Sequence, residues 1–272
     1  MGRAVKCDFE DAHLTMNFAP LTRYGLLSVT GADARAFLHA QLTNDIEKLP
    51  PERAALAGWC SAKGRLLASF LVIPTSQGFL LQLSQDLVPA VLKRLTMFVL
   101  RSKVTITDAS GQWKQLGVWG GVPGFEVPAG AFAIAENDST VAVRMGDARF
   151  LLLASDTASI DGQQVAEDRW TLDEILAGRP LISGATQDQF VPQMVNFDTL
   201  GAVNFQKGCY PGQEIVARAQ YRGQVKRRMK LLHAPAGVEP KPGQDFEGGT
   251  VVDAAPSDNG WALLAVLPVA SA

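Results

Sequence analysis

The stretch FQKGCYPGQEIVARAQYRGQVKRRMK, residues 205–230, carries the most information in this chain. Gly208 and Gly212 flank Cys209, and glycines let the backbone of a turn approach a ligand closely. Lys207 stands two residues before the thiol, where a cation favours the thiolate form. Free cysteines are more often buried and structural. The stretch therefore predicts either a functional thiol at Cys209 or a structural one.

Positive charge is concentrated in the same stretch. It holds one acidic residue, Glu214, and seven basic residues: Lys207, Arg218, Arg222, Lys226, Arg227, Arg228 and Lys230. The rest of the chain has 18 basic and 26 acidic residues, and the whole chain has a net charge of −2. A local excess of this kind focuses anions, although a solvated basic face is the ordinary alternative. The overall charge disfavours a protein that coats nucleic acid and leaves a local basic patch open, and no DNA partner is expected.

The composition is that of a globular protein. The 272 residues are 47% hydrophobic and 19% charged, which suits about two domains with buried cores. The longest apolar runs, Leu66–Ile73 and Trp261–Ala270, fall short of the roughly 20 residues of a membrane helix. The N-terminus lacks the apolar core of a signal peptide, and Lys6 interrupts the myristoylation pattern. We therefore expect a cytoplasmic protein without a membrane partner.

Common metal-binding and catalytic motifs are absent from the sequence. No ligand spacing is found among the cysteines and histidines, which are Cys7, Cys60, Cys209, His13, His39 and His233. There is also no dinucleotide fingerprint, P-loop or G-x-S-x-G motif. We expect neither a disulfide framework nor a metal site, and redox, phosphoryl-transfer and serine-hydrolase chemistry are disfavoured.

The pattern of apolar residues predicts an α+β arrangement in the first half of the chain. Tyr24–Val29 is typical of a strand, and the apolar residues between Ala34 and Leu42 recur at helical spacing. The following elements are a hairpin of Ala54–Cys60 and Leu66–Ile73 with its turn at residues 61–64, a strand at Phe79–Leu83, a helix from about Asp86 and a strand at Val104–Thr107. Residues 51–110 thus predict an α+β module whose sheet is covered on one face.

The second half of the chain is richer in strands. Strands are expected at Gln115–Trp119, Val141–Met145 and Phe150–Ala154, and a helix at about Asp168–Ala177. After residue 225, short apolar runs alternate with Gly- and Pro-rich turns. This alternation is typical of a small antiparallel β unit or barrel.

Four segments of the chain resemble the YgfZ family of folate-binding bacterial proteins, which are linked to iron–sulfur enzymes and tRNA modification. The segments are KGCYPGQEIVAR at 207–218 with its flanks FVPQMVNFDTLGAVNF and YRGQVKR, YGLLSVTGADARAFLHAQLTNDI at 24–46, CSAKGR at 60–65, and WTLDEILAGRPLI at 170–182. The resemblance covers most of residues 20–230 and is weak in the C-terminal part.

This resemblance implies the fold of the folate-dependent aminomethyltransferase of glycine cleavage, an α+β protein with three domains around a central folate cavity. The first domain would be discontinuous, at about residues 1–50 and 112–222. An inserted ferredoxin-like module would occupy residues 51–111, and a small β-barrel would occupy residues 223–272. The implied cofactor is tetrahydrofolate or a related folate.

The resemblance also implies roles for single residues. Tyr24 and Trp170 occupy the positions of the aromatic residues that line the family's folate pocket, although many relatives carry Trp where Tyr24 stands. Core packing of an amphipathic helix is the alternative role for Trp170. Cys209, biased towards thiolate by Lys207, would meet a partner, a cluster or a one-carbon adduct. The supporting motif residues are Gly208, Tyr210, Gly212, Gln213, Glu214, Arg218 and Arg222, and Glu214 and Arg218 are spaced to pair on a helix.

Two positions depart from the related families. Pro211 stands where a Thr is usual, and the strand Leu66–Phe70 lacks the acidic residue that the aminomethyltransferases carry. The missing acid disfavours a transferase reaction. The expected function is therefore a folate-binding accessory protein that supports iron–sulfur enzymes or their assembly proteins, and through them tRNA modification. The alternatives are a one-carbon transferase and a tRNA-binding module that uses the basic residues of 218–230.

Overall fold

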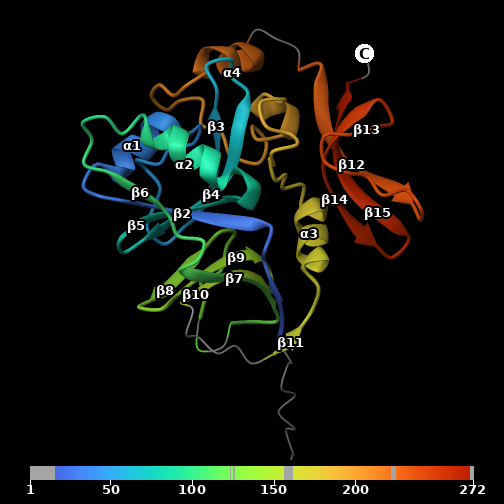
Figure 1. The fold of residues 1–272 in the computed structure, drawn as a ribbon, viewed down its shortest axis with the longest axis horizontal. Coiled ribbons are helices and arrows are strands. Elements are labelled where there is room, and N and C mark those ends of the chain that lie inside the picture. Colours follow the sequence, from blue (N-terminus) through green and yellow to red (C-terminus); the bar gives the residue numbers. More distant parts are fainter. Residues whose placement is uncertain (1–15, 123, 125, 156–161, 222–224, 270–272) are drawn as a thin grey trace, which may run out of the picture.

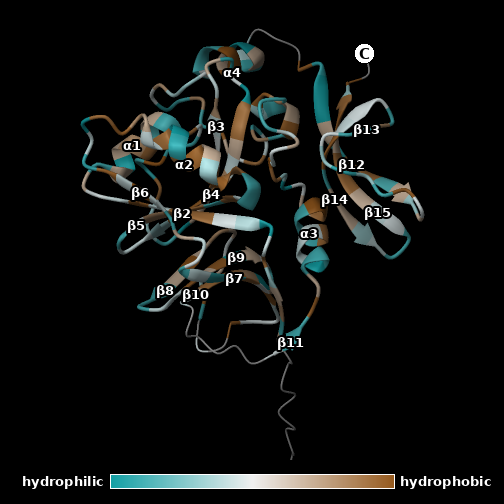
Figure 2. Ribbon diagram, in the orientation of Figure 1, coloured by the Kyte–Doolittle hydropathy of each residue, from teal (hydrophilic) through white to brown (hydrophobic). Residues whose placement is uncertain are grey.

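The structure is a computed structural model that describes residues 16–122, 124, 126–155, 162–221 and 225–269. Cys7, His13 and Arg222 lie outside these residues. The strands form three sheets, and helix α3 (Glu167–Leu176) lies between the C-terminal sheet and the other two (Figure 1). Hydrophobic residues are concentrated on the strands of these sheets (Figure 2).

The first sheet has five antiparallel strands in the order β3-β4-β5-β2-β6. Its elements in chain order are β2 (Tyr24–Thr30), α1 (Ala34–Gln41), β3 (Ala55–Cys60), β4 (Leu66–Thr75), β5 (Gly78–Ser84), the 3-10 turn η1 (Gln85–Leu87), α2 (Val88–Thr96) and β6 (Thr105–Asp108). The order β4-β5-β2-β6, with α1 and α2 as crossovers, is the ferredoxin-like arrangement, and β3 adds an edge strand.

Strand β2 is part of this sheet, because it pairs with β5 on one side and with β6 on the other. The expected domain boundary assigned β2 and α1 to the discontinuous first domain. The hydrogen bonds instead make β2 a component of the ferredoxin-like unit, and α1 packs against β5 of the same sheet. Strand pairing between distant segments determines this placement, and hydrophobic periodicity carries no information about it.

The five-stranded sheet is covered on both faces, which corrects the expectation of a single covered face. Strand β4 is buried from Leu66 to Pro74. Helices α1 and α2 pack on one face (Figure 1). On the other face, residues such as Leu26 and Ile73 form one apolar cluster with Val141 and Leu151 of the second sheet.

The second sheet has six strands in the order β11-β1-β7-β10-β9-β8. Its strands are β1 (Asn17–Pro20), β7 (Trp113–Trp119), β8 (Ile134–Asn137), β9 (Thr140–Gly146), β10 (Arg149–Ser155) and β11 (Gln163–Gln164). The three central strands β7, β9 and β10 match the sequence-based expectation. The short strands β1, β8 and β11 were not expected.

The C-terminal strands form a third sheet in the order β12-β15-β14-β13. The remaining elements are η2 (Pro192–Val195), α4 (Gln213–Tyr221), β12 (Arg227–Pro235), β13 (Asp245–Phe246), β14 (Gly249–Ser257) and β15 (Gly260–Pro268). Strands β12 and β13 are edges, so the expected small barrel is an open half-barrel. Arg23 anchors it, since its guanidinium lies 2.8 Å from the buried Asp253 carboxylate of β14.

Candidate functional site

Lys207 fixes the loop around Cys209 to the end of helix α1. Its ammonium group donates hydrogen bonds to the backbone carbonyls of His39 and Leu42, the latter at 2.7 Å. It also lies 4.9 Å from the centre of the Tyr210 ring. The last carbonyls of a helix have no partner within it, and a cation satisfies them. Burial lowers the pKa of Lys207 to about 8.

The same loop packs against the hairpin turn between β3 and β4. Gly212 has a φ of +77°, and a Cβ added there would lie 2.4 Å from the Ser61 carbonyl oxygen and 2.6 Å from the Gly64 Cα. A Cβ on Gly64 would in turn lie 2.8 Å from the Cβ of Ile215. Only glycine fits both positions. The CSAKGR and KGCYPGQE segments therefore meet in space through close packing of their backbones.

Cys209 is exposed at this junction, so the burial that a structural cysteine requires is not found. Lys207, two residues earlier in the chain, brings its ammonium group to the same junction. His39 is also close, because a Cβ added to Gly208 would lie 3.6 Å from its Nε2 atom. The Nδ1 atom of His39 lies 3.2 Å from an oxygen of Asp45. An exposed thiol, an ammonium group, an imidazole and a carboxylate are thus gathered at the end of α1.

Cys60 and Tyr210 form the buried layer beneath the loop. Both belong to the largest hydrophobic cluster. Burial, with a smaller effect from Asp188, raises the pKa of the Cys60 thiol to about 12. Burial also raises the pKa of Tyr210 above its ordinary value. Of the two described cysteines, only Cys209 is open to a reagent or a partner.

Helix α4 begins at Gln213 and carries the end of the motif. Glu214 and Arg218 lie on it, but no ion pair joins these two described side chains, which corrects the expected pairing. Both are exposed, and solvent competes effectively for such pairs. The helix is held instead by the buried Gln193, whose Nε2 atom donates to the Val216 carbonyl at 2.7 Å.

Three basic residues of the stretch 205–230 donate hydrogen bonds to other groups of the protein. Lys207 binds helix carbonyls, and Arg227 donates to the backbone carbonyls of Gly248 and Val266. Arg228 makes two hydrogen bonds of 2.7 Å to the carboxylate of Asp198. The surface here is therefore less basic than the sequence alone indicates.

A second candidate site is a cavity of about 40 Å³ between the first two sheets, beside α3. Its polar lining comes from Tyr24, Ser69, Gln82, Glu174 and Arg179. Burial and, secondly, the Glu174 carboxylate raise the pKa of the Tyr24 hydroxyl, so this group stays protonated and available as a donor. Of the two aromatic residues expected at a folate, Tyr24 lines this cavity.

The Glu174 carboxylate is fully engaged by two arginines. Arg179 donates to both of its oxygens, at 2.7 and 2.8 Å, and Arg149 lies 2.9 Å from one of them. Paired donors from a planar guanidinium hold a carboxylate in a fixed orientation. A ligand that bound Glu174 would have to displace one of these contacts.

Trp170 is a core residue in this structure. It is 1% exposed, and Gly117 packs so closely that an added Cβ would lie 2.3 Å from the indole ring. The Arg149 guanidinium lies 4.9 Å from the ring centre, and Trp119 meets the ring edge to face. Trp170 is absent from the lining of the central cavity. Its expected stacking on a folate stays a prediction that requires these contacts to open.

The polar groups that line the 40 Å³ cavity beside α3 suit the donors and acceptors of a pterin, but its volume is too small for one. About 40 Å³ holds roughly one water molecule, whereas pockets for drug-sized ligands have volumes of about 300–1,000 Å³. A folate does not fit the cavity in this conformation. Binding requires the lining, including the segment at Arg179, to move outwards.

His39, Asp45, Glu174 and Arg179 were not singled out from the sequence. Glu174 and Arg179 lie within WTLDEILAGRPLI, where an acid and a base flank the end of a helix. His39 lies in the last turn of α1, where an imidazole is favourable next to helix carbonyls. For both pairs of residues, the position near the end of a predicted helix was the sequence feature that could have indicated them.

The described residues contain no group of three or more His, Cys, Asp and Glu side chains placed to hold a metal ion. Within the same part of the chain, no helix is long and apolar enough to cross a membrane.

The fold defines the class of protein. The solved glycine cleavage system aminomethyltransferase T from Bartonella henselae matches with a TM-score of 0.71, at 16% identity, over 94% of this chain and 79% of that one. A model of the GCVT N-terminal domain matches residues 8–122. The expected aminomethyltransferase-like α+β fold is thus confirmed.

Sequence similarity then gives the family. This chain is 31% identical to the tRNA-modifying protein YgfZ of Serratia proteamaculans (strain 568), over 87% of this chain and 76% of the relative. It is 32% identical to the tRNA-modifying protein YgfZ of Klebsiella pneumoniae (strain 342), over 94% and 86%. The chain belongs to the YgfZ family, as its motifs indicated.

Proposed function

We propose that this protein supports tRNA modification as a folate-binding accessory factor of iron–sulfur enzymes. The observation that carries the proposal is the meeting of the two family segments, CSAKGR and KGCYPGQE, around an exposed Cys209. Glycines packed backbone to backbone keep the thiol-bearing loop rigid, and rigid placement is what a recognition or reaction site needs. The name of the relatives supports the link to tRNA modification.

In this proposal Cys209 is the point of contact with an iron–sulfur client or its assembly protein. The thiol of Cys209 is exposed, and cysteine attacks electrophiles and binds metals through its sulfur. A single cysteine cannot hold a cluster by itself. The remaining ligands would therefore come from the partner.

The folate part of the proposal is supported by the fold and by the polar lining at Tyr24, Glu174 and Arg179. Because the cavity is too small here for a folate, we infer that folate binding is coupled to an outward movement of this lining. Opening would separate Arg179 or Arg149 from Glu174 and expose polar groups that match a pterin ring. The folate would act as a bound signal or structural ligand rather than as a consumed substrate.

A one-carbon transferase is the less favoured candidate. Strand β4 runs through LLASFLVIPT without a carboxylate, and its Ser69 hydroxyl accepts a hydrogen bond from the Ile182 backbone N–H at 2.9 Å. A serine held in this way cannot replace a carboxylate as a proton acceptor or a stabiliser of positive charge.

The test is complementation in cells that lack their own family member, with the modified nucleosides of total tRNA measured by mass spectrometry. The wild-type protein should restore the nucleoside profile, and Cys209→Ser should not. Cys60→Ala is the matched control, because it removes the buried thiol and should still complement. Full complementation by Cys209→Ser would overturn the role of this thiol.

A further inference from the structure

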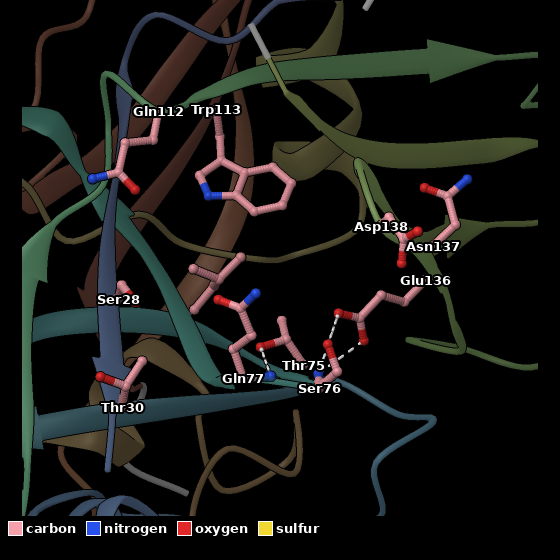
Figure 3. Close-up of a pocket in the computed structure, with 11 residues that line it drawn as sticks. Ser28, Thr30, Thr75, Ser76, Gln77, Gln112, Trp113, Glu136, Asn137 and Asp138 are labelled. Atoms are coloured by element: carbon pink, nitrogen blue, oxygen red, sulfur yellow. Dashed lines mark hydrogen bonds between the residues drawn. The ribbon is translucent and has the colours of Figure 1, made fainter.

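A further cavity lies away from both candidate sites, between the first two sheets at their outer ends. Its volume is about 510 Å³. Figure 3 shows the hairpin turn of β4 and β5 meeting β8 and the turn that follows it, with Trp113 of β7 on another side of the space. Polar side chains of Ser28 and Thr30 on β2 form part of the wall.

Hydrogen bonds hold the two turns together at one end of this cavity. The Ser76 backbone N–H and hydroxyl both donate to the Glu136 carboxylate, the hydroxyl at 2.9 Å (Figure 3). These contacts join segments 60 residues apart in sequence. The cavity is therefore a built feature of the fold, with walls fixed relative to each other.

The cavity carries negative charge that no described side chain neutralises. Glu136 receives hydrogen bonds only from neutral donors of Ser76, and Asp138 has no partner among the described residues. No lysine or arginine is among the described residues that line it. Carboxylates that share a concave surface without a cation attract positively charged ligands.

Trp113 supplies an aromatic surface inside the same cavity. The residue is half-buried, and its indole ring lines the cavity on the side away from the contact between Ser76 and Glu136 (Figure 3). The face of an indole is the strongest cation–π partner among the side chains. Leu80 adds apolar surface for methylene groups, and the amides of Gln77 and Gln112 offer polar contacts.

We propose that this cavity binds a small organic cation, an aliphatic amine or guanidinium compound, with its charged group between Trp113 and the carboxylates of Glu136 and Asp138. The volume suits a free small molecule, since ligand pockets range over about 300–1,000 Å³. An anion would meet two uncompensated carboxylates. A neutral sugar would form no charge–charge interaction with these carboxylates.

Isothermal titration with spermidine and with argininamide tests this proposal, with glucose and glutamate as neutral and anionic comparisons. At least one of the two cations should bind saturably, whereas glucose and glutamate should not bind. Asp138→Asn should weaken the binding by about threefold to tenfold, and Trp113→Leu by about tenfold or more. Asp147→Asn is the matched control, because it removes an exposed carboxylate outside the cavity and should leave affinity unchanged.

Three results would overturn the proposal. One is the absence of saturable binding by either cation. Another is binding that Asp138→Asn and Trp113→Leu leave unchanged, which would place the ligand elsewhere on the acidic surface. The third is tighter binding of glucose or glutamate than of the cations.

Discussion

Gly64 and Gly212 approach so closely that a Cβ on Gly212 would lie 2.6 Å from the Cα of Gly64. The two residues come from the hairpin of the five-stranded sheet and from the Cys209 loop, 148 positions apart in the chain. Their contact explains why both family segments contain a glycine at these places. The position of the thiol depends on this backbone contact.

Gly212→Ala should therefore be strongly destabilising. It adds a Cβ at a φ of +77° and drives it into the Ser61 carbonyl, so we expect a loss of about 2–4 kcal/mol in the free energy of unfolding. Gly201→Ala is the control, since Gly201 has a φ of +70° with nothing within 4 Å, and should cost about 1 kcal/mol. Equal losses in urea denaturation would show that the close approach is unimportant.

Lys207 should make stability depend on pH. Its folded pKa of about 8 lies below its ordinary 10.5, so folding disfavours the ammonium form. The resulting stabilisation is fully present above pH 10.5 and is lost as the pH falls through about 8. Relative to Lys207→Met, the wild type should gain on the order of 2 kcal/mol over this window. If the free energy of unfolding changes with pH by the same amount in both proteins, this prediction is wrong.

The two described cysteines should differ in reactivity. Cys209 is exposed, whereas Cys60 is buried with its thiol pKa raised to about 12. Iodoacetamide near neutral pH should thus modify Cys209 at least about tenfold faster, because the thiolate is the reactive form. Peptide mass mapping over time measures both rates in one sample. Preferential modification of Cys60 would refute the arrangement described for the loop.

Gly117→Ala should disturb Trp170. The new Cβ would lie 2.3 Å from the indole ring, so the ring has to shift within a packed core, at a cost of about 1–3 kcal/mol. Gly146→Ala is the matched strand control, with its nearest added contact at 3.7 Å, and should be close to neutral. The change in tryptophan fluorescence should appear in Gly117→Ala alone. Its appearance in both variants would assign the effect to the sheet as a whole.

Local features of the fold were predictable from the sequence. The turn at residues 61–64 is marked by Gly64 at positive φ, and the helix Glu167–Leu176 by its apolar spacing and the following Gly178. The short strands β1 and β8 were not predicted, since four residues are too few to show the alternation of apolar and polar residues. Each is stabilised by pairing with a distant segment.

The candidate site was only partly predictable, for the same reason. Cys209 and Lys207 could be selected because charge and glycine spacing are local properties. The hydrogen bonds of Lys207 to α1 join residues 165 or more positions apart, and nothing in either segment encodes their meeting. The burial of Trp170 likewise depends on Gly117, which the sequence pattern did not connect with it.

Titration of tetrahydrofolate into the protein, with its concentration followed during and after binding, tests the central claim most directly. We predict saturable binding at one site without consumption of the folate, even with an added amine. Tyr24→Phe should weaken binding by roughly 1 kcal/mol through loss of the cavity hydroxyl. Absence of binding, or turnover of tetrahydrofolate when an amine is present, would contradict the account.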